Sequence, residues 1–432
     1  MQWWKKTVLW QRVLAGLLLG VAVGLAFRTL GGSVVIDGVR VYPGAEFVTT
    51  WIKPFGSAFI QLIKMLVVPL VFTTLVTGIT AMGHPSKLGS IGLRAFGLYI
   101  LTTLVAVTIG LVFGSIFKPG SGVDFTDVAP NVLAGNAPSM TERLIAIIPA
   151  NPFASLSSGD MLAVIFFALL LGVAILMVGK PANPVRDLFD AGVQIMFKIT
   201  HWVMELAPIG VFALIAWVTA TKGVETFSSV LMLALALYLG CITHMILMYG
   251  GLVKLVLRLP LVRFFRGILD AQVVAFSTST SAGTLPVTIS CVQDNLGIKP
   301  VVAGSVLPLG ATINMDGTSL YLGLLTLFAA NAFGLDVSAM DYVLIAITAT
   351  LASIGTASIP SASLFMLAIV LPVIGVSPEQ IAIMVGFILP FDRPLDMMRT
   401  MTNVTGDAAV ATAVAKWEGE LDEDVYRAAA KV

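Results

Sequence analysis

Between Ser277 and Pro286 the chain reads STSTSAGTLP, and this run interrupts an otherwise largely apolar stretch, residues 264–297. A second run, GTASIPSAS at residues 355–363, interrupts the stretch 342–376 in the same way. Small and hydroxyl-bearing residues around a proline favour turns over continuous helix. Each stretch is therefore predicted to be a helical hairpin that enters the membrane and turns back.

The composition around these runs is that of a membrane protein. Only 11% of the 432 residues are charged and 57% are apolar, whereas soluble domains have about 25% charged residues. Asp, Glu, Lys and Arg are absent from residues 95–117, 161–179, 226–253 and 342–378. A helix crosses the hydrocarbon with roughly 20 residues, so each stretch can span it. A transmembrane barrel would need alternating segments of about 10 residues, which the sequence lacks.

The predicted fold is all-α, with eight spanning helices and two re-entrant hairpins. A hairpin followed by a polar-bearing helix occurs twice, which indicates an inverted repeat with a binding site near the bilayer midplane. The alternative, that the interrupted stretches are flexible loops, conflicts with their apolar flanks. The predicted spans are residues 10–30, 53–82, 88–117, 159–179, 193–221, 227–257, 301–334 and 379–415.

The charged residues and the cysteines indicate how the chain is oriented in the membrane and which partners are not expected. Basic residues in short loops mark the cytoplasmic side, so both termini of this multi-pass chain are expected on the cytoplasmic face of the plasma (inner) membrane. The first helix lacks a cleavage site and is expected to be retained. A net charge of +1 argues against a nucleic-acid partner, and Cys241 and Cys291 indicate neither a disulfide framework nor a metal site. The basic residues used are Lys5, Lys6, Arg12, Lys254, Arg258, Arg263 and Arg266.

The eighth predicted helix carries a polar face. Its polar residues are spaced by 4, 3, 4 and 4 positions, which places them on one side of a helix. An ionisable group inside a membrane costs about 2.5–3.5 kcal/mol even on a lenient scale, so this face indicates a functional site. A purely structural salt bridge between Asp396 and Arg399 is the alternative, but the acids outnumber the arginine. The face consists of Asp392, Asp396, Arg399, Asn403 and Asp407.

The seventh predicted helix offers oxygen ligands for a cation. Residues 310–318 read GATINMDGT. Amide, carboxylate and hydroxyl oxygens suit an alkali or alkaline-earth cation rather than a transition metal. In the third predicted helix, the hydroxyls of Tyr99, Thr102 and Thr103 either add ligands or only pack helices together.

The charges of the eighth helix suit a zwitterion with an extra carboxylate. Arg399 is a bidentate donor for a carboxylate, whereas Asp396 suits an ammonium group. Arg393 lies off the polar face and is expected to extend toward the membrane surface.

These residues resemble the dicarboxylate/amino-acid:cation symporter family, also called the glutamate transporter family. The motifs are NMDGT at 314–318, the hairpin tip at 279–288, and DxxxDxxRTxxNVxGD at 392–407. The resemblance runs nearly end to end and includes LIKMLVVPL at 62–70 and IPANP at 148–152.

The resemblance implies a sodium-coupled symporter of aspartate or glutamate, not an enzyme, that assembles as a homotrimer in the lipid bilayer. A scaffold, residues 1–82 and 119–222, would hold a mobile transport domain. That domain, residues 83–118 and 223–415, would slide like an elevator with the second hairpin as its gate, and residues 416–432 would form a cytoplasmic tail.

The resemblance also implies a substrate site. Arg399 with Thr318 would hold the side-chain carboxylate of the substrate. Asp396 and Thr400 would take its amino group, and Asn403 with the first hairpin its α-carboxylate. The implied substrate-binding residues are Ser279, Thr280, Ser281, Thr318, Ile359, Ser363, Asp396, Arg399, Thr400 and Asn403.

Three sodium sites follow from the same resemblance. The first lies beside the eighth helix, the second under the gate and the third beside the third helix. Their ligands are, in that order, Gly310, Asn314, Asn403 and Asp407; Thr312, Met315, Ser353, Ile354 and Thr356; and Tyr99, Thr102, Thr103, Asn314 and Asp316.

The chain departs from the family pattern at five positions. Archaeal members carry an arginine at the position of Ser279 and animal members at that of Met397, so this supporting charge is expected to be missing. Ser361 and Ser363 replace glycines of the second tip. Leu322 replaces a glutamate of proton-coupled members, which argues against proton cotransport at that site.

Other functions remain open. The C4-dicarboxylate branch of the family replaces the acid at position 396, and the neutral amino-acid branch lacks the arginine at position 399; both are present here. A proton-coupled symporter is a further alternative. An ion channel would show a carbonyl filter motif, and an intramembrane hydrolase would have to use Asp316 and Asp407 as a dyad.

Overall fold

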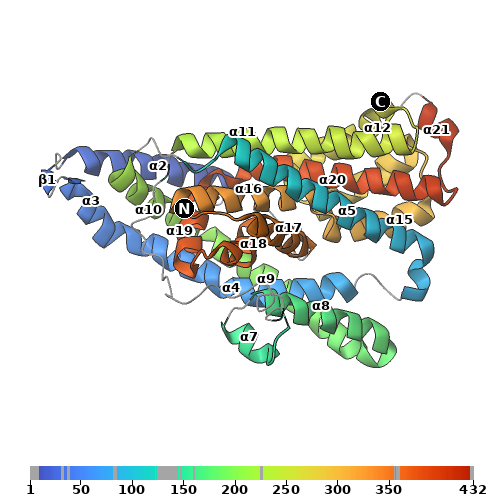
Figure 1. Cartoon of the computed structure of the whole chain (residues 1–432), viewed down its shortest axis with the longest axis horizontal. Coiled ribbons are helices and arrows are strands. Elements are labelled where there is room, and N and C mark those ends of the chain that lie inside the picture. The colour runs from blue at the N-terminus through green and yellow to red at the C-terminus, as the bar shows by residue number, and fades with distance from the viewer. Residues whose placement is uncertain are drawn as a thin grey trace, which may run out of the picture.

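The computed structural model is almost entirely helical in the part of the chain that it describes (Figure 1). The described residues are 9–30, 34–36, 39–80, 85–121, 123, 145, 148–158, 161–223, 227–354, 356 and 361–428. One antiparallel ribbon joins β1 (Val34–Ile36) to β2 (Val39–Val41). The first helices are α2 (Leu9–Leu30), α3 (Pro43–Phe47), η1 (Val48–Ile52), α4 (Lys53–Thr80), α5 (Pro85–Phe117), α7 (Pro152–Ser158), α8 (Met161–Val178), η2 (Lys180–Ala182), α9 (Asn183–Glu205) and α10 (Ala207–Lys222).

The second half of the chain holds the two interrupted stretches and the polar helices. Its elements are α11 (Phe227–His244), η3 (Met245–Tyr249), η4 (Leu252–Val256), α12 (Leu261–Gly267), α13 (Leu269–Thr278), α14 (Ser281–Ser290), η5 (Cys291–Asn295), α15 (Pro300–Ile313), α16 (Asp316–Phe333), α17 (Ala339–Ile354), α18 (Ser363–Val370), η6 (Leu371–Ile374), α19 (Pro378–Ile388), η7 (Leu389–Phe391), α20 (Asp392–Trp417) and α21 (Glu423–Arg427).

Several helices are apolar enough to cross a membrane. Within the described residues, three qualify by length and composition: Gln11–Thr29, Ser90–Phe117 and Ser228–Val256. The pair Lys180–Val203 and Ala207–Thr221, bent by 51°, passes the same test when its two helices are counted as one broken span. Large apolar side chains face outward, as with Met177, which is 78% exposed on α8. Such a surface suits a membrane protein, whereas the count of eight spans stays a prediction.

Three predicted spans are divided, which corrects the expectation of single helices. The stretch 193–221 breaks at Leu206, because Pro208 in the first turn of α10 cannot donate to the preceding helix. The stretch 301–334 breaks at Asn314 and Met315, whose backbone is not helical. The stretch 379–415 breaks at the short 3-10 turn η7, which contains a proline.

Both interrupted stretches are pairs of helices that pack against each other. In the first, only Ser279 and Thr280 separate α13 from α14, so the break is shorter than predicted. Ser279 has φ 56°, a left-handed conformation that ends α13. In the second, α17 and α18 flank a tip of which residues 355 and 357–360, Ile359 included, lie outside the described residues.

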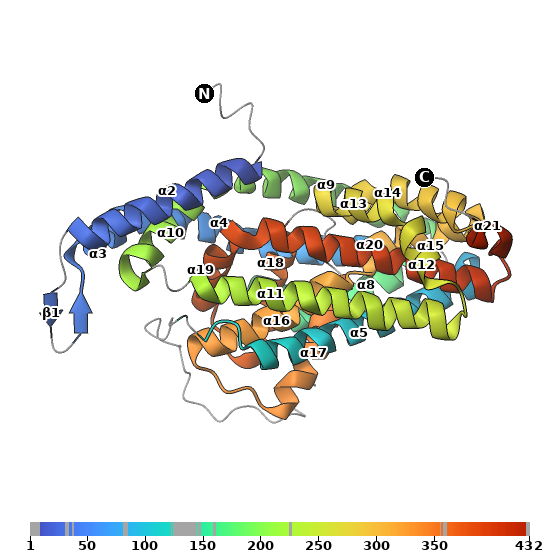
Figure 2. The same ribbon diagram turned by 90° about the horizontal axis from the view of Figure 1, so that it is seen from above.

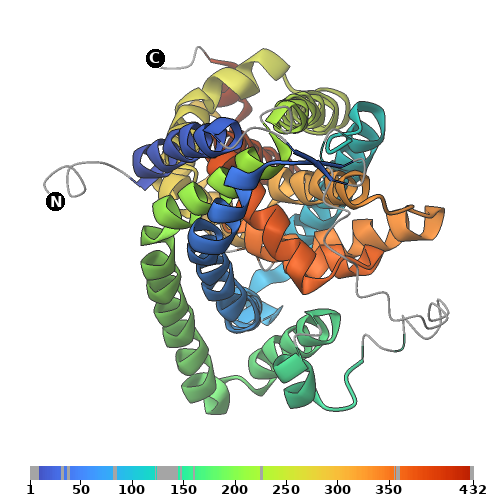
Figure 3. The same cartoon turned by 90° about the vertical axis from the view of Figure 1, so that its left-hand side faces the viewer.

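The helices pack in two groups. In the first, α2 packs along α10, and α4 packs against α8, α9 and α10. Glycines at every fourth position of α2 allow this contact; a Cβ at Gly20 would lie only 2.8 Å from the Phe212 carbonyl oxygen. In the second group, α5, α11, α13, α15 and α16 surround α20 (Figures 1 and 2). Viewed end-on, α20 lies near the middle of the molecule and α9 at its margin (Figure 3).

Candidate functional site

A small polar cavity lies where the tips of the two hairpin stretches approach α20. The first tip, α16 and α20 line most of it, and Ala362 and Ser363 of the second tip cover one side. Eight of the ten predicted substrate-binding residues line it, together with two predicted sodium ligands, Met315 and Thr356. The eight are Ser279, Thr280, Ser281, Thr318, Ser363, Asp396, Thr400 and Asn403.

Arg399 lies directly behind this cavity and is fully buried. Its NH2 group is 2.8 Å from Asp396 Oδ1, and its NH1 group is 3.0 Å from Asp392 Oδ1. The guanidinium stacks 4.0 Å from the ring centroid of Tyr321, whose hydroxyl donates to Asp392 at 3.0 Å. The salt bridge between Asp396 and Arg399 therefore exists, and Arg399 is shared by two carboxylates, of which only Asp396 lines the cavity.

Asp396 also connects α20 to the second tip. Its Oδ2 accepts a hydrogen bond from the backbone N–H of Ser361 at 3.0 Å. Ser361 has φ 62°, a conformation that costs a residue other than glycine about 1–2 kcal/mol. The contact therefore compensates for part of the strain at this tip.

Two serine hydroxyls at the cavity are buried and unpaired. Within the described part of the chain, neither Ser279 Oγ nor Ser363 Oγ has a hydrogen-bond partner. Their side chains are 2% and 3% exposed. A buried hydroxyl without a partner costs about 1–3 kcal/mol, so a polar ligand in the cavity would recover this free energy.

A first oxygen-rich cluster joins α15 to α20. Asn314 donates through Nδ2 to Asp407 Oδ1 at 2.9 Å and to the Asn403 carbonyl at 3.2 Å. The backbone of Gly310 approaches so closely that an added Cβ would lie 2.5 Å from Asp407 Oδ1. All four residues of the predicted first sodium site thus lie together, and Asn403 also borders the substrate cavity.

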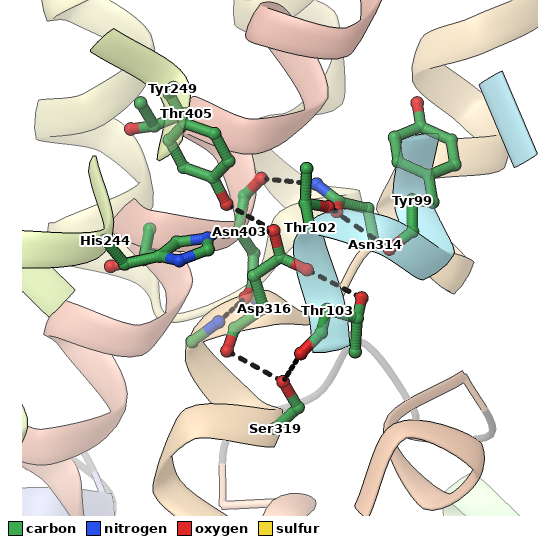
Figure 4. Close-up of polar contacts among 12 residues, drawn as sticks. Tyr99, Thr102, Thr103, His244, Tyr249, Asn314, Asp316, Ser319, Asn403 and Thr405 are labelled. Atoms are coloured by element: carbon green, nitrogen blue, oxygen red, sulfur yellow. Dashed lines mark hydrogen bonds and ion pairs between the residues drawn. The ribbon is translucent and has the colours of Figure 1, made fainter. Parts of the chain in front are cut away.

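A second cluster surrounds Asp316 (Figure 4). Thr103 donates to Asp316 Oδ1 at 2.7 Å, and Thr102 lies 3.4 Å from Asn314 Oδ1. The Tyr99 hydroxyl donates to the Val306 carbonyl at 3.0 Å and lies close to the Gly310 backbone. Thr102, Thr103, Asn314 and Asp316 of the third predicted sodium site therefore lie close together, whereas the Tyr99 hydroxyl points to Val306.

Sequence reasoning missed two partners of Asp316. Tyr249 donates to Asp316 Oδ2 at 2.6 Å, and His244 Nε2 lies 3.2 Å from the same oxygen (Figure 4). Both residues are fully buried. The available signal was a histidine and a tyrosine inside the uncharged stretch 226–253.

Two residues of the predicted second sodium site, Met315 and Thr356, line the substrate cavity. Thr312, Ser353 and Thr356 each donate their hydroxyl to a carbonyl of their own chain segment, at 2.9, 2.8 and 3.1 Å. Met315 Sδ lies 3.3 Å from Asn403 Nδ2 instead. Ile354 is the last residue of α17, directly before the second tip.

A larger, shallow hollow lies elsewhere, on the outer face of α9. Asp187, Asp190, Gln194 and Lys198 line it, with two apolar residues between them. It contains none of the predicted site residues and lies open to the surroundings, so we place the functional site at the hairpin tips.

Comparisons with known proteins show which family this chain resembles over most of its length. A family model described as the sodium:dicarboxylate symporter family matches residues 9–417. The proton/sodium-glutamate symport protein of Geobacillus stearothermophilus is 32% identical over 423 residues, which cover 96% of this chain and 95% of the relative. The C4-dicarboxylate transport protein of Rhodospirillum rubrum is 32% identical over 426 residues, covering 96% and 90%. The proton/glutamate-aspartate symporter of Bacillus subtilis is 35% identical over 373 residues, covering 85% and 89%.

Proposed function

The chain belongs to the sodium:dicarboxylate symporter family, and we propose that it couples sodium entry to the uptake of an acidic amino acid, aspartate or glutamate. Its function is secondary active symport. The observation that carries the substrate proposal is the pairing of Asp396, which lines the cavity, with the Arg399 guanidinium 2.8 Å away. Opposite charges side by side complement a zwitterion, whereas a dicarboxylate would meet the Asp396 carboxylate with like charge.

Substrate binding would replace the contact between Asp396 and Arg399 by contacts of each residue with the substrate. The substrate ammonium would take Asp396, and a substrate carboxylate would accept from Arg399, which Asp392 and Tyr321 hold in place. A charged bidentate contact in a buried site is among the stronger hydrogen bonds that a protein makes. Thr318, Thr400, Asn403 and the tip hydroxyls would complete the site, with Ile359 and Ser363 covering it.

Sodium ions would bind in the two oxygen-rich clusters, and a third ion under the second tip is proposed from the family resemblance. Asn314 belongs to both clusters, and Asn403 joins the first cluster to the substrate cavity. A cation that orders these shared residues would raise the affinity for the substrate, and the substrate would raise the affinity for the cation by the same factor.

The packing of the helices supports an elevator arrangement. The group around α4 and α10 would be the scaffold of a homotrimer, and the group around α20 the mobile transport domain. Each hairpin is followed by a divided helix, α15–α16 and α19–α20, as an inverted repeat requires. Eight spans, an inner-membrane location and cytoplasmic termini complete this proposal.

Radiolabelled uptake into proteoliposomes tests the function. Aspartate or glutamate uptake should saturate and require a sodium gradient, with succinate and serine competing poorly. The second candidate is C4-dicarboxylate or proton-driven transport, because relatives bear those names. Uptake that follows only the pH gradient, or that succinate inhibits as well as aspartate does, would favour it.

A variant of the first cluster tests the coupling. Asp407→Asn removes the charged ligand from one sodium site, so half-saturation by sodium should move to roughly tenfold higher concentration, about 1.4 kcal/mol. Saturating sodium should restore most substrate binding, since Asp407 does not line the cavity. Unchanged sodium dependence would contradict the assignment, and Asp294→Asn, outside both clusters, is the control.

A further inference from the structure

Arg393 holds a place that the sequence did not suggest. It is the second residue of α20. Its NH2 group donates to the Ser277 carbonyl at 3.1 Å and to the Thr278 carbonyl at 3.3 Å. Ser277 and Thr278 end α13, so Arg393 reaches the tip of the first hairpin rather than only the membrane surface.

This contact suits the chemistry of a helix end. The last carbonyls of a helix have no partner within it, and a cation there also interacts favourably with the helix dipole. The NH2 nitrogen of Arg393 carries two N–H donors, so it can serve both carbonyls at once. On the other side of the turn, Thr280 caps α14 by accepting from the Gly283 N–H at 3.2 Å.

The turn of α20 that carries Arg393 is itself anchored. Tyr238 of α11 donates to the Pro394 carbonyl at 2.8 Å. Deeper in the hairpin, Gln272 of α13 donates to Thr405 of α20 at 2.9 Å. The first hairpin is thus attached to α20 at its tip and along its length, next to the cavity that Ser279, Thr280 and Ser281 line.

We propose that Arg393 is a positioning residue that fixes the first tip against α20, so that its three cavity-lining residues stay at binding distance from the substrate. Ser279 and Met397 stand where other members of the family carry an arginine, and neither has a guanidinium. Arg393 supplies one to the first tip from a third position in the sequence. The inference rests on the transport function proposed above.

The test compares two arginines that each donate from one nitrogen to two backbone carbonyls at a helix end. Arg28 donates through NH1 to the carbonyls of Ala220 and Thr221, at 3.1 and 2.9 Å, near the end of α10 and away from the cavity. Arg393→Ala and Arg28→Ala therefore remove the same kind of bond. Amide hydrogen exchange of the full-length protein, measured by mass spectrometry, reports the order of each helix end, and equilibrium binding of aspartate at saturating sodium reports the cavity.

Arg393→Ala should speed exchange at residues 275–283 and weaken aspartate binding about two- to fivefold, the range for a cation at a helix end. Arg393→Lys should restore part of both, because the charge remains. Arg28→Ala should loosen the end of α10 and the contact of Arg28 with the Tyr42 ring, 3.9 Å away, and leave the first tip and the cavity unchanged. If Arg393→Ala does not fold, Arg393→Gln replaces it in the same comparison.

Two results would overturn the inference: unchanged tip exchange in the Arg393 variants, or an equal loss of affinity in the Arg28 and Arg393 variants. Failure of the proposed function is distinguishable, because the wild-type protein would then show no sodium-dependent uptake of acidic amino acids while tip exchange still reports on Arg393.

Discussion

The two hairpin tips reach the same cavity but are attached to α20 in different ways. The first tip is held through backbone carbonyls, by an arginine outside the cavity lining. Among the described residues of the second tip, the backbone N–H of Ser361 donates to the carboxylate of Asp396, which lines the cavity. Both tips contain a serine in the left-handed conformation, Ser279 and Ser361, so local backbone strain does not separate them.

The two attachments differ in whether the substrate can compete for the group that holds the tip. A substrate ammonium at Asp396 would compete with Ser361 for the carboxylate and so act directly on the second tip. The bonds of Arg393 to the first tip involve no residue proposed to touch the ammonium. We therefore expect the first tip to keep its position when the substrate binds and the second tip to change its position.

Arg399→Ala should cause the largest loss of affinity for the substrate, because Arg399 holds Asp396 as well as the substrate carboxylate. Removing one partner of a buried charge pair costs about 2–5 kcal/mol, so aspartate affinity should fall by roughly 30-fold to several thousand-fold. Calorimetric or radioligand binding measures this. Arg399→Lys, which keeps the charge without the fork, should lie in between. Wild-type affinity in Arg399→Ala would contradict the site.

Asp396→Asn should separate substrates with and without an ammonium. A hydrogen bond to a charged group contributes about 1.5–3 kcal/mol, so aspartate should lose roughly 10- to 100-fold in affinity. Inhibition of uptake by succinate should change little or improve. Equal losses for both compounds would show that Asp396 acts only through Arg399 or the second tip.

Ser279→Ala and Ser363→Ala remove one unpaired cavity hydroxyl from each tip. If each hydroxyl binds the substrate, affinity should fall by about 0.5–1.5 kcal/mol per variant, roughly two- to tenfold. The two variants form a matched pair, since the side chains are buried alike. An effect from Ser279 alone would mean that the second tip only covers the ligand.

The smallest expected effect is that of Glu423→Gln on stability, in the segment that packs against the base of the first hairpin. The segment after α20 packs there: Tyr426 is buried, and α21 contacts α12 and η5. Lys416 and Arg427 bind Glu423 and lower the pKa of its carboxyl below the usual value. This stabilisation is complete above the ordinary pKa of glutamate and is lost as the pH falls through the lowered value.

Because these side chains are largely solvated, Glu423→Gln should lower the free energy of unfolding by less than about 0.5 kcal/mol at neutral pH. The difference from wild type should vanish in acid, which thermal unfolding at several pH values measures. A larger loss, or one that persists at low pH, would indicate that Glu423 supports the docked segment by other means.

The amino-acid pattern alone predicts the class of this protein and the core of the proposed site. Long uncharged stretches without the alternation of a barrel strand are helical in a membrane, because a helix satisfies its backbone hydrogen bonds within the segment. The polar face of α20 also followed from helical spacing alone, and all five of its residues are buried. Turn-forming residues predicted a break in each of the two interrupted stretches, and the break of the first stretch lies at Ser279 and Thr280.

Which residues meet across long distances in the chain depends on how the helices pack. His244 lies 72 positions from Asp316, and Arg393 lies 116 positions from Ser277. Helical spacing gives the face on which a side chain lies but not the helix that packs against that face. The break at Asn314 and Met315 has the same origin, because packing turns an amide and backbone groups toward Asp407 and Asn403. Local preferences thus set the elements, whereas long-range contacts between buried polar groups set the site.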